Sequence, residues 1–359
     1  MTVPLTTLPS PEILETPTVL RALIRAHRHL AELKGIAGII PNPDILVSTL
    51  LLQEAKDSSE IENIFTTQDE VYQASLFGKQ SKNPAAKEVR RYADALQSGF
   101  QQIRKDGLIT INRIIDFHTE LMESNAGIRK LPGTVIKNQA TGEVVFRPPQ
   151  DPNDIQMLLT DLERFVNDDR IYPADPLIQM AVAHHQFESI HPFYDGNGRA
   201  GRILNSLFLV AKGLLDAPVL YLSAYIIESK AAYYRLLQST RDTGEWEPWL
   251  IYMIEGVGQT AKNTTSLIVR IQTLMQDFET RIRTALPKIY SYELLGNLFR
   301  HPYTKIEAVQ NDLGVSRLTA SKYLTELSNA GFLHKRKFGK YNYYINAELL
   351  RLLERSRPQ

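Results

Sequence analysis

The 359-residue sequence contains no cysteine, which excludes disulfide scaffolds, thiolate metal sites, iron–sulfur clusters and cysteine nucleophiles. It also lacks any uninterrupted apolar run approaching about eighteen residues, so we expect no membrane-spanning helix. The first residues show no basic stretch followed by an apolar core, so we expect no secretory signal. The cytoplasm is therefore the expected location, with no membrane partner.

Net charge is also nearly absent, because 41 Lys and Arg oppose 40 Asp and Glu. With 43% hydrophobic residues, the chain has enough apolar material for two or three globular domains. The charge is unevenly distributed. Residues 290–359 carry 11 basic and 6 acidic residues, a net charge of +5, which leaves −4 for residues 1–289.

Most of the chain shows helical periodicity, because apolar residues recur every three or four positions. These windows are residues 20–33, 43–54, 84–105, 110–122, 151–167, 175–189, 199–212, 223–241 and 246–286. The exception is residues 133–149, where two β-branched runs flank a Thr-Gly turn, which predicts a β-hairpin that covers a surface. The expected fold is mainly α, a helical bundle with one hairpin.

The last seventy or so residues differ from the bundle, and Pro287 is the expected boundary. We expect a helix at 305–312 and a second helix at 317–329, with Ser316 as its N-cap. Two short strands around Gly339 follow. This order resembles a winged-helix domain in which residues 317–329 occupy the recognition position.

Residues 191–202 read HPFYDGNGRAGR and contain the parts of an anion-binding site. Gly196 and Gly198 allow backbone N–H groups to approach an anion closely at the start of a helix, where the helix dipole favours negative charge. Arg199 and Arg202 lie three residues apart on one helical face and offer two forked cations to outer phosphates.

The same loop also contains a hard oxygen ligand and a base. Asp195 precedes the glycines and suits Mg²⁺ held against phosphates. His191 has an ordinary pKa near neutrality and can accept a proton from an attacking hydroxyl. Singly, each feature is typical of a turn or a solvated helix face, but together they indicate phosphoryl-group chemistry.

This loop resembles the motif of Fic-domain proteins, His-x-Phe-x-Asp/Glu-Gly-Asn-Gly-x-x-x-Arg, and matches every specified position. The resemblance extends over about residues 84–241, so it implies a Fic-type helical bundle with the hairpin as its flap. Members of that family mostly transfer AMP from ATP to a hydroxyl side chain (Ser, Thr or Tyr) of a target protein and release pyrophosphate.

The resemblance implies a role for each residue of the loop. His191 would be the base, Asp195 would hold Mg²⁺, and either Tyr233 or Tyr234 would line the adenine pocket, with Tyr234 favoured. Nucleotide binding would fall to Gly196, Asn197, Gly198, Arg199, Ala200, Gly201, Arg202 and Tyr234.

A second motif lies upstream at residues 58–63, SSEIEN. Ser59 and Glu62 have the spacing of a capping box, which would mark an ordinary helix start. Ser58, Glu62 and Asn63 also resemble the inhibitory motif that many Fic proteins carry before the core. On that resemblance Glu62 pairs with Arg202, so that ATP binds unproductively within a single autoinhibited chain.

The expected domains are residues 1–80, with an inhibitory helix near 57–64, residues 81–286 as the Fic core, and residues 287–359 as the winged helix. The resemblance also implies a target protein, self-modification and a homodimer. Three alternatives stay open at this point. The site could remove AMP from a modified protein. It could be a metal-dependent hydrolase, with His184 or His185 beside His191 and Asp195. The chain could also be a DNA-binding regulator that contacts phosphates through Lys335, Arg336, Lys337 and Lys340.

Overall fold

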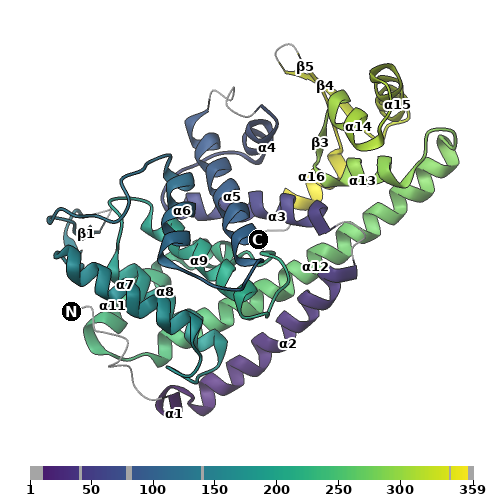
Figure 1. The fold of residues 1–359 in the computed structure, drawn as a ribbon. Helices are drawn as coiled ribbons and strands as arrows, with labels where there is room; N and C mark the ends of the chain where they lie inside the picture. The colour runs from purple at the N-terminus through teal and green to yellow at the C-terminus, as the bar shows by residue number, and fades with distance from the viewer. Residues whose placement is uncertain (1–10, 40–42, 78–82, 139–140, 339–340, 355–359) are drawn as a thin grey trace. The chain divides into compact units, whose positions relative to one another are not determined.

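The computed structural model describes residues 11–39, 43–77, 83–138, 141–338 and 341–354, and it is mostly helical (Figure 1). The chain forms two compact units. The first comprises residues 1–34 and 51–262, and the second comprises residues 35–50 and 263–359. The expected divisions after residues 80 and 286 stay predictions.

The first unit is a helical bundle with one hairpin. Its elements are α1 (Pro11–Leu14), α2 (Pro17–Ile39), α3 (Pro43–Ile61), α4 (Gln68–Phe77), α5 (Pro84–Ile103), α6 (Ile111–Met122), β1 (Ile136–Lys137), β2 (Val144–Phe146), α7 (Pro152–Asn167), α8 (Pro176–Ile190), α9 (Asn197–Ala211), α10 (Leu222–Glu228), α11 (Lys230–Thr243) and α12 (Glu247–Ala285). Helices α2, α3 and α12 contribute residues to both units.

Helix α8 forms the centre of this unit, because every residue from Leu177 to Ile190 is buried. A helix without a polar face is typical of such a position. Asp175 begins it as an N-cap, accepting a hydrogen bond from the Leu177 N–H at 2.8 Å. The neighbouring α9 is buried over most of its length. The loop that joins these two helices is therefore anchored in the core at both ends.

The expected hairpin is present, with β1 and β2 antiparallel and Ile136 opposite Phe146. The expected helix 223–241 is instead two helices, which meet at Ser229. The Ser229 hydroxyl donates to the Tyr225 carbonyl at 2.7 Å, a local bond that competes with regular helix geometry.

The expected helix 43–54 continues to Ile61 as α3. The SSEIEN segment therefore lies at the end of a helix, and the interpretation of Ser59 and Glu62 as a capping box that starts one is wrong. The segment expected as an inhibitory helix near 57–64 combines the last residues of α3 with a turn at Glu62 and Asn63.

The second unit contains α13 (Tyr292–Arg300), β3 (Tyr303–Thr304), α14 (Ile306–Leu313), α15 (Arg317–Asn329), β4 (His334–Phe338), β5 (Tyr341–Ile345) and α16 (Ala347–Glu354). Its strands form one antiparallel sheet in the order β3-β5-β4. The two expected helices and two expected strands are present, and Ser316 caps α15 as predicted. Gly339 and Lys340 lie outside the described residues.

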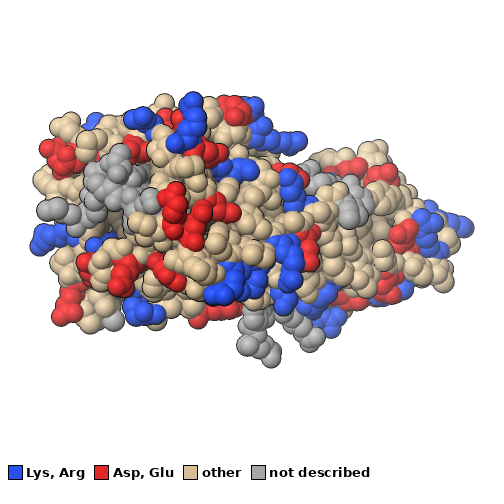
Figure 2. Space-filling view, turned by 90° about the horizontal axis from the view of Figure 1, so that it is seen from below, with Lys and Arg blue, Asp and Glu red and all other residues tan. Residues whose placement is uncertain are grey.

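Acidic and basic side chains are interspersed over the face seen in Figure 2, in keeping with the small net charge of the chain. Within the described ranges, no helix combines the length and the apolar character that crossing a membrane requires.

Candidate active site

The loop between α8 and α9 begins at His191, which has a left-handed backbone with φ 49° and ψ 58°. Its N–H donates to the Phe187 carbonyl at 2.9 Å and so closes the last turn of α8. A non-glycine residue in this conformation is strained and persists only where its surroundings enforce it. Gly196, with φ 76°, then begins α9.

The interior of the loop is held by reciprocal contacts. The Asn197 side chain accepts from the Phe193 N–H and donates to the Phe193 carbonyl, both at 2.9 Å. The His118 ring of α6 stacks on the Phe193 ring with centroids 3.6 Å apart, and its Nε2 lies 2.8 Å from the Asp195 carbonyl. Phe193, Asp195 and Asn197 therefore have defined positions at the start of α9.

A side chain on either glycine would displace a neighbouring side chain. A Cβ on Gly196 would lie 2.6 Å from Met122 Sδ, and one on Gly198 would overlap Glu62 Oε1. The Asp195 carboxylate is exposed beside this cradle and accepts from the Gly196 N–H at 2.7 Å. One exposed carboxylate next to an anion cradle fits Mg²⁺, which proteins commonly hold by one or two carboxylates together with substrate phosphates.

Both arginines of the loop are buried and paired with carboxylates. Arg199 forms an ion pair with Glu88 of α5. Arg202 pairs through Nη2 with Glu62 Oε1 at 2.8 Å. It also donates from Nε to Ser58 Oγ at 2.8 Å and from Nη2 to the Ser58 carbonyl at 3.0 Å.

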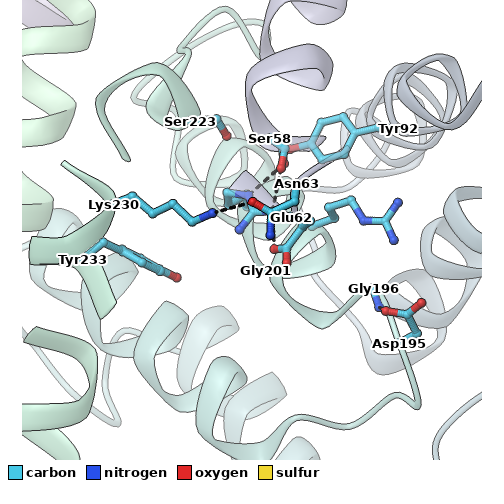
Figure 3. A network of polar contacts seen from close by, with 12 residues as sticks. Ser58, Glu62, Asn63, Tyr92, Asp195, Gly196, Gly201, Ser223, Lys230 and Tyr233 are labelled. Carbon is cyan, nitrogen blue, oxygen red and sulfur yellow. Dashed lines mark hydrogen bonds and ion pairs between the residues drawn. The ribbon is translucent and has the colours of Figure 1, made fainter. Parts of the chain in front are cut away.

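The structure thus brings the upstream motif against the loop (Figure 3). Burial alone would raise the pKa of Glu62, but Arg202, Arg199 and Lys230 hold that pKa below its ordinary value. Asn63 follows with a left-handed backbone, and its Oδ1 accepts from Lys230 Nζ at 3.2 Å. Ser58, Glu62 and Asn63 all lie in this network.

His191 is neutral at neutral pH. Burial lowers its pKa to about 4, and the positive charges of Arg241 and Arg129 act in the same direction. A neutral imidazole can accept a proton, which a general base requires.

The two tyrosines differ in accessibility. Tyr233 is buried, and its hydroxyl lies 2.8 Å from His184 Nε2. Tyr234 is 42% exposed, and its ring stands edge-on to that of Tyr233. Ala200 and Gly201 are buried in α9, and a Cβ on Gly201 would lie 2.5 Å from Glu188 Oε1 of α8.

The Fic/DOC family N-terminal profile matches residues 20–101, and the Fic/DOC family profile matches residues 108–209, together more than half of the chain. The chain belongs to the Fic/DOC family. A third profile, the C-terminal domain of protein adenylyltransferases described as SoFic-like, matches residues 274–349.

Curated relatives are similar over part of the chain only. The protein adenylyltransferase fic-1 of Caenorhabditis elegans is 31% identical over 146 residues, 40% of this chain and 26% of that protein. The protein adenylyltransferase Fic of Drosophila erecta is 29% identical over 152 residues, 42% of this chain and 28% of that protein. The matched region spans roughly a quarter of each relative.

Solved Fic structures share the fold. A Fic family protein from Desulfovibrio desulfuricans G20 superposes with a TM-score of 0.59 at 19% identity, covering 92% of this chain and 96% of its own. Residues 134–508 of Fic-1 from C. elegans superpose with a TM-score of 0.53 at 18% identity, covering 72% and 75%.

In this Fic family chain, His184 and His185 do not join a ligand cluster. Burial lowers the pKa of each to about 3, and their Nε2 atoms lie near Tyr233 Oη and the Leu237 carbonyl. Among the described residues no group of three or more His, Asp or Glu is placed to hold a metal ion. The geometry therefore gives no support to the hydrolase alternative.

Sequence reasoning missed several residues that the structure places against the Fic loop. Among them are Glu88, His118 and Arg129, which contact Arg199, the Asp195 carbonyl and the His191 carbonyl respectively. Each stands alone in the sequence without a motif around it, so a single sequence carries no local signal for it.

Proposed function

We propose that this protein transfers AMP from ATP to a hydroxyl side chain of a protein. One observation carries the proposal: a neutral, half-buried His191 caps the end of α8, and the glycine cradle begins α9 only a few residues later. A base and an anion site on one short loop suit attack on a bound phosphate. The names and partial similarity of the curated relatives support the same activity.

In the proposed reaction, His191 accepts the proton of the target hydroxyl. The hydroxyl oxygen forms a bond to the α-phosphorus of ATP, the bond from that phosphorus to the bridging oxygen breaks, and pyrophosphate leaves. The N–H groups of Gly196 to Gly198 and the N-terminus of α9 would stabilise the phosphates. Arg199 and Arg202 would bind the outer phosphates, and Tyr234 would contact adenine. Mg²⁺ held by Asp195 would neutralise phosphate charge.

We further propose that Glu62 inhibits this activity. Its carboxylate lies against Gly198 and pairs with Arg202, so it competes for the cation that would orient the γ-phosphate. Self-modification and a homodimer are proposals that rest on the family resemblance alone.

Mass spectrometry after incubation with ATP and Mg²⁺ tests the activity. We expect an AMP adduct on the chain itself or on an added protein, and its loss in His191→Ala with ATP binding retained. His334→Ala, which changes an exposed histidine of the second unit, is the matched control and should keep the adduct. Full adduct formation by His191→Ala would contradict the proposal.

The second unit supports an additional candidate function. We propose that it is a winged-helix domain that binds DNA, with α15 in the recognition position. The exposed strand β4 presents Lys335, Arg336 and Lys337, and residues 290–359 have a net charge of +5. A mobility-shift titration tests it: binding should weaken steeply as salt rises, and no binding at low ionic strength would remove this role.

A further inference from the structure

Arg129 lies in the segment between α6 and β1, and its side chain is completely buried. Its guanidinium donates only to backbone carbonyls in the contacts observed. Nε donates to the His191 carbonyl at 2.8 Å, and Nη2 donates to the Ile190 carbonyl at 3.2 Å. Nη2 also donates to the carbonyl of Pro149, which follows strand β2.

The carbonyls of Ile190 and His191 at the end of α8 need a hydrogen-bond donor from outside the helix. The last carbonyls of a helix have no partner within it, and they carry the negative end of the helix dipole. Here the end of α8 is buried and the chain turns sharply at His191, whose left-handed backbone is costly. Arg129 supplies both hydrogen-bond donors and positive charge at this point. The backbone N–H of Arg129 also donates to the Pro192 carbonyl at 2.9 Å.

The residues that follow Arg129 hold the middle of the same loop. The Tyr194 hydroxyl accepts from the Lys130 N–H at 3.0 Å and from the Leu131 N–H at 3.2 Å. The segment 129–131 therefore contacts the loop at its start and at Tyr194, just before the cradle.

A second arginine makes a parallel connection between the hairpin and α8. The Arg241 guanidinium of α11 lies 4.3 Å from the centre of the Phe146 ring on β2. Its Nε donates to Ser189 Oγ of α8 at 2.9 Å. The hairpin is thus tied to the end of α8 both at β2 and at Pro149.

We infer that Arg129 is a positioning residue of the active site, which fixes the backbone of His191 and the end of the hairpin in one geometry. The effects on kcat and KM that we expect from this inference rest on the proposed function. The base and the end of the hairpin then keep a constant separation, and transfer to a hydroxyl requires such a fixed geometry around the base.

Arg129 also acts on the charge of the His191 ring. Burial, Arg241 and Arg129 lower the pKa of His191, whereas the Glu188 backbone and the charge of Glu62 raise it. These groups come from α11, the 129–131 segment, α8 and the end of α3. Removing Arg129 should therefore move the pKa of His191 upward, toward its ordinary value.

Two variants separate position from charge. Arg129→Lys keeps the positive charge but loses the forked guanidinium that binds several carbonyls. Its kcat should therefore fall about 10- to 100-fold, with the KM for ATP unchanged and the pKa of His191 still low. Arg129→Met loses both the charge and the guanidinium, so kcat should fall and the pKa of His191 should rise. Arg170→Met, at an exposed arginine paired with Asp168, is the control and should change neither quantity.

The pKa of His191 is read by NMR of the unliganded protein, with its ring signal assigned by its absence in His191→Ala. This readout needs no activity, so a wild-type protein that transfers no AMP would end the proposed function without deciding the inference. Wild-type kcat in Arg129→Lys would overturn the positioning role. An unchanged pKa of His191 in a folded Arg129→Met would instead overturn the effect of Arg129 on the charge of the His191 ring. If Arg129→Met does not fold, Arg129→Lys alone decides through kcat against the KM for ATP.

Discussion

At the scale of single residues, Glu62 is the side chain whose removal has the clearest expected effect. It pairs with the buried Arg202 and touches the cradle at Gly198. Glu62→Gly should raise labelling of the chain by radioactive ATP, because Arg202 then becomes available to phosphate. Relief of a partly exposed ion pair worth on the order of 1–2 kcal/mol corresponds to roughly a tenfold increase.

The control is Glu60→Gly, which alters a neighbouring glutamate that pairs with Lys56 instead. Equal or lower labelling in Glu62→Gly than in the wild type would count against inhibition by this carboxylate. If both variants gained equally, the cause would be a weakened end of α3 and not the loss of the Glu62–Arg202 pair.

The loop residues could be predicted because their types and spacing lie within one short segment. Glu88 and Arg129 could not be predicted, because their partners lie far away in the sequence. Glu88 is 111 residues from Arg199, and Arg129 is 62 residues from His191. The pair between Glu62 and Arg202 was expected only from the family resemblance, and the pairing of Arg199 was not expected, since ion pairs depend on which helices pack together. Tertiary packing, and not local pattern, decides these contacts.

At the scale of elements, helices with a continuous apolar face were predicted well, and α3 shows why others were not. Its end lacks the expected periodicity because the buried face there is polar, with Glu54, Asp57, Ser58 and Ser59 all buried. Glu54 accepts hydrogen bonds from the Tyr92 hydroxyl at 3.0 Å and from the Ser223 N–H at 3.1 Å. A polar face can be buried when other helices supply its partners.

Strand β4 carries an element-scale prediction for the proposed DNA contact. Lys335 and Lys337 alternate along the strand and so share one face. The double variant Lys335→Glu, Lys337→Glu should weaken DNA binding and reduce the slope of log K against log salt by about 1.8, about 0.9 for each lost phosphate contact. Arg104→Glu, Lys105→Glu, at two exposed positions after α5, is the matched control and should keep the wild-type slope. Equal slopes for the two double variants would place any DNA contact elsewhere.

At the scale of the whole molecule, helical periodicity was enough to predict a mainly α fold, since the signal recurs in window after window. The two compact units were not predicted, because α2, α3 and α12 are shared between them and no loop marks the division. A boundary inside a helix leaves no break in the sequence pattern. Domain boundaries are readable only where composition or turn residues change.

The stability of the whole chain should depend on pH through two buried carboxyls. Burial raises the pKa of Glu54 to about 7 and that of Glu188 to about 7, against an ordinary 4.5. Between those values the unfolded chain loses these protons and the folded chain keeps them. Their contribution is therefore fully present below pH 4.5 and is lost as the pH rises through about 7.

Each group could contribute at most ~3 kcal/mol over that interval. Glu54→Gln should remove one such contribution, so the free energy of unfolding of the wild type should fall relative to that of Glu54→Gln as the pH rises from 5 to about 8. Urea unfolding at several pH values measures this difference.

The buried histidines, whose lowered pKa values act in the opposite sense, are present in both proteins and cancel in the comparison. Adding Glu188→Gln should remove the second contribution, whereas parallel pH profiles for all three proteins would show that neither carboxyl retains its proton on folding.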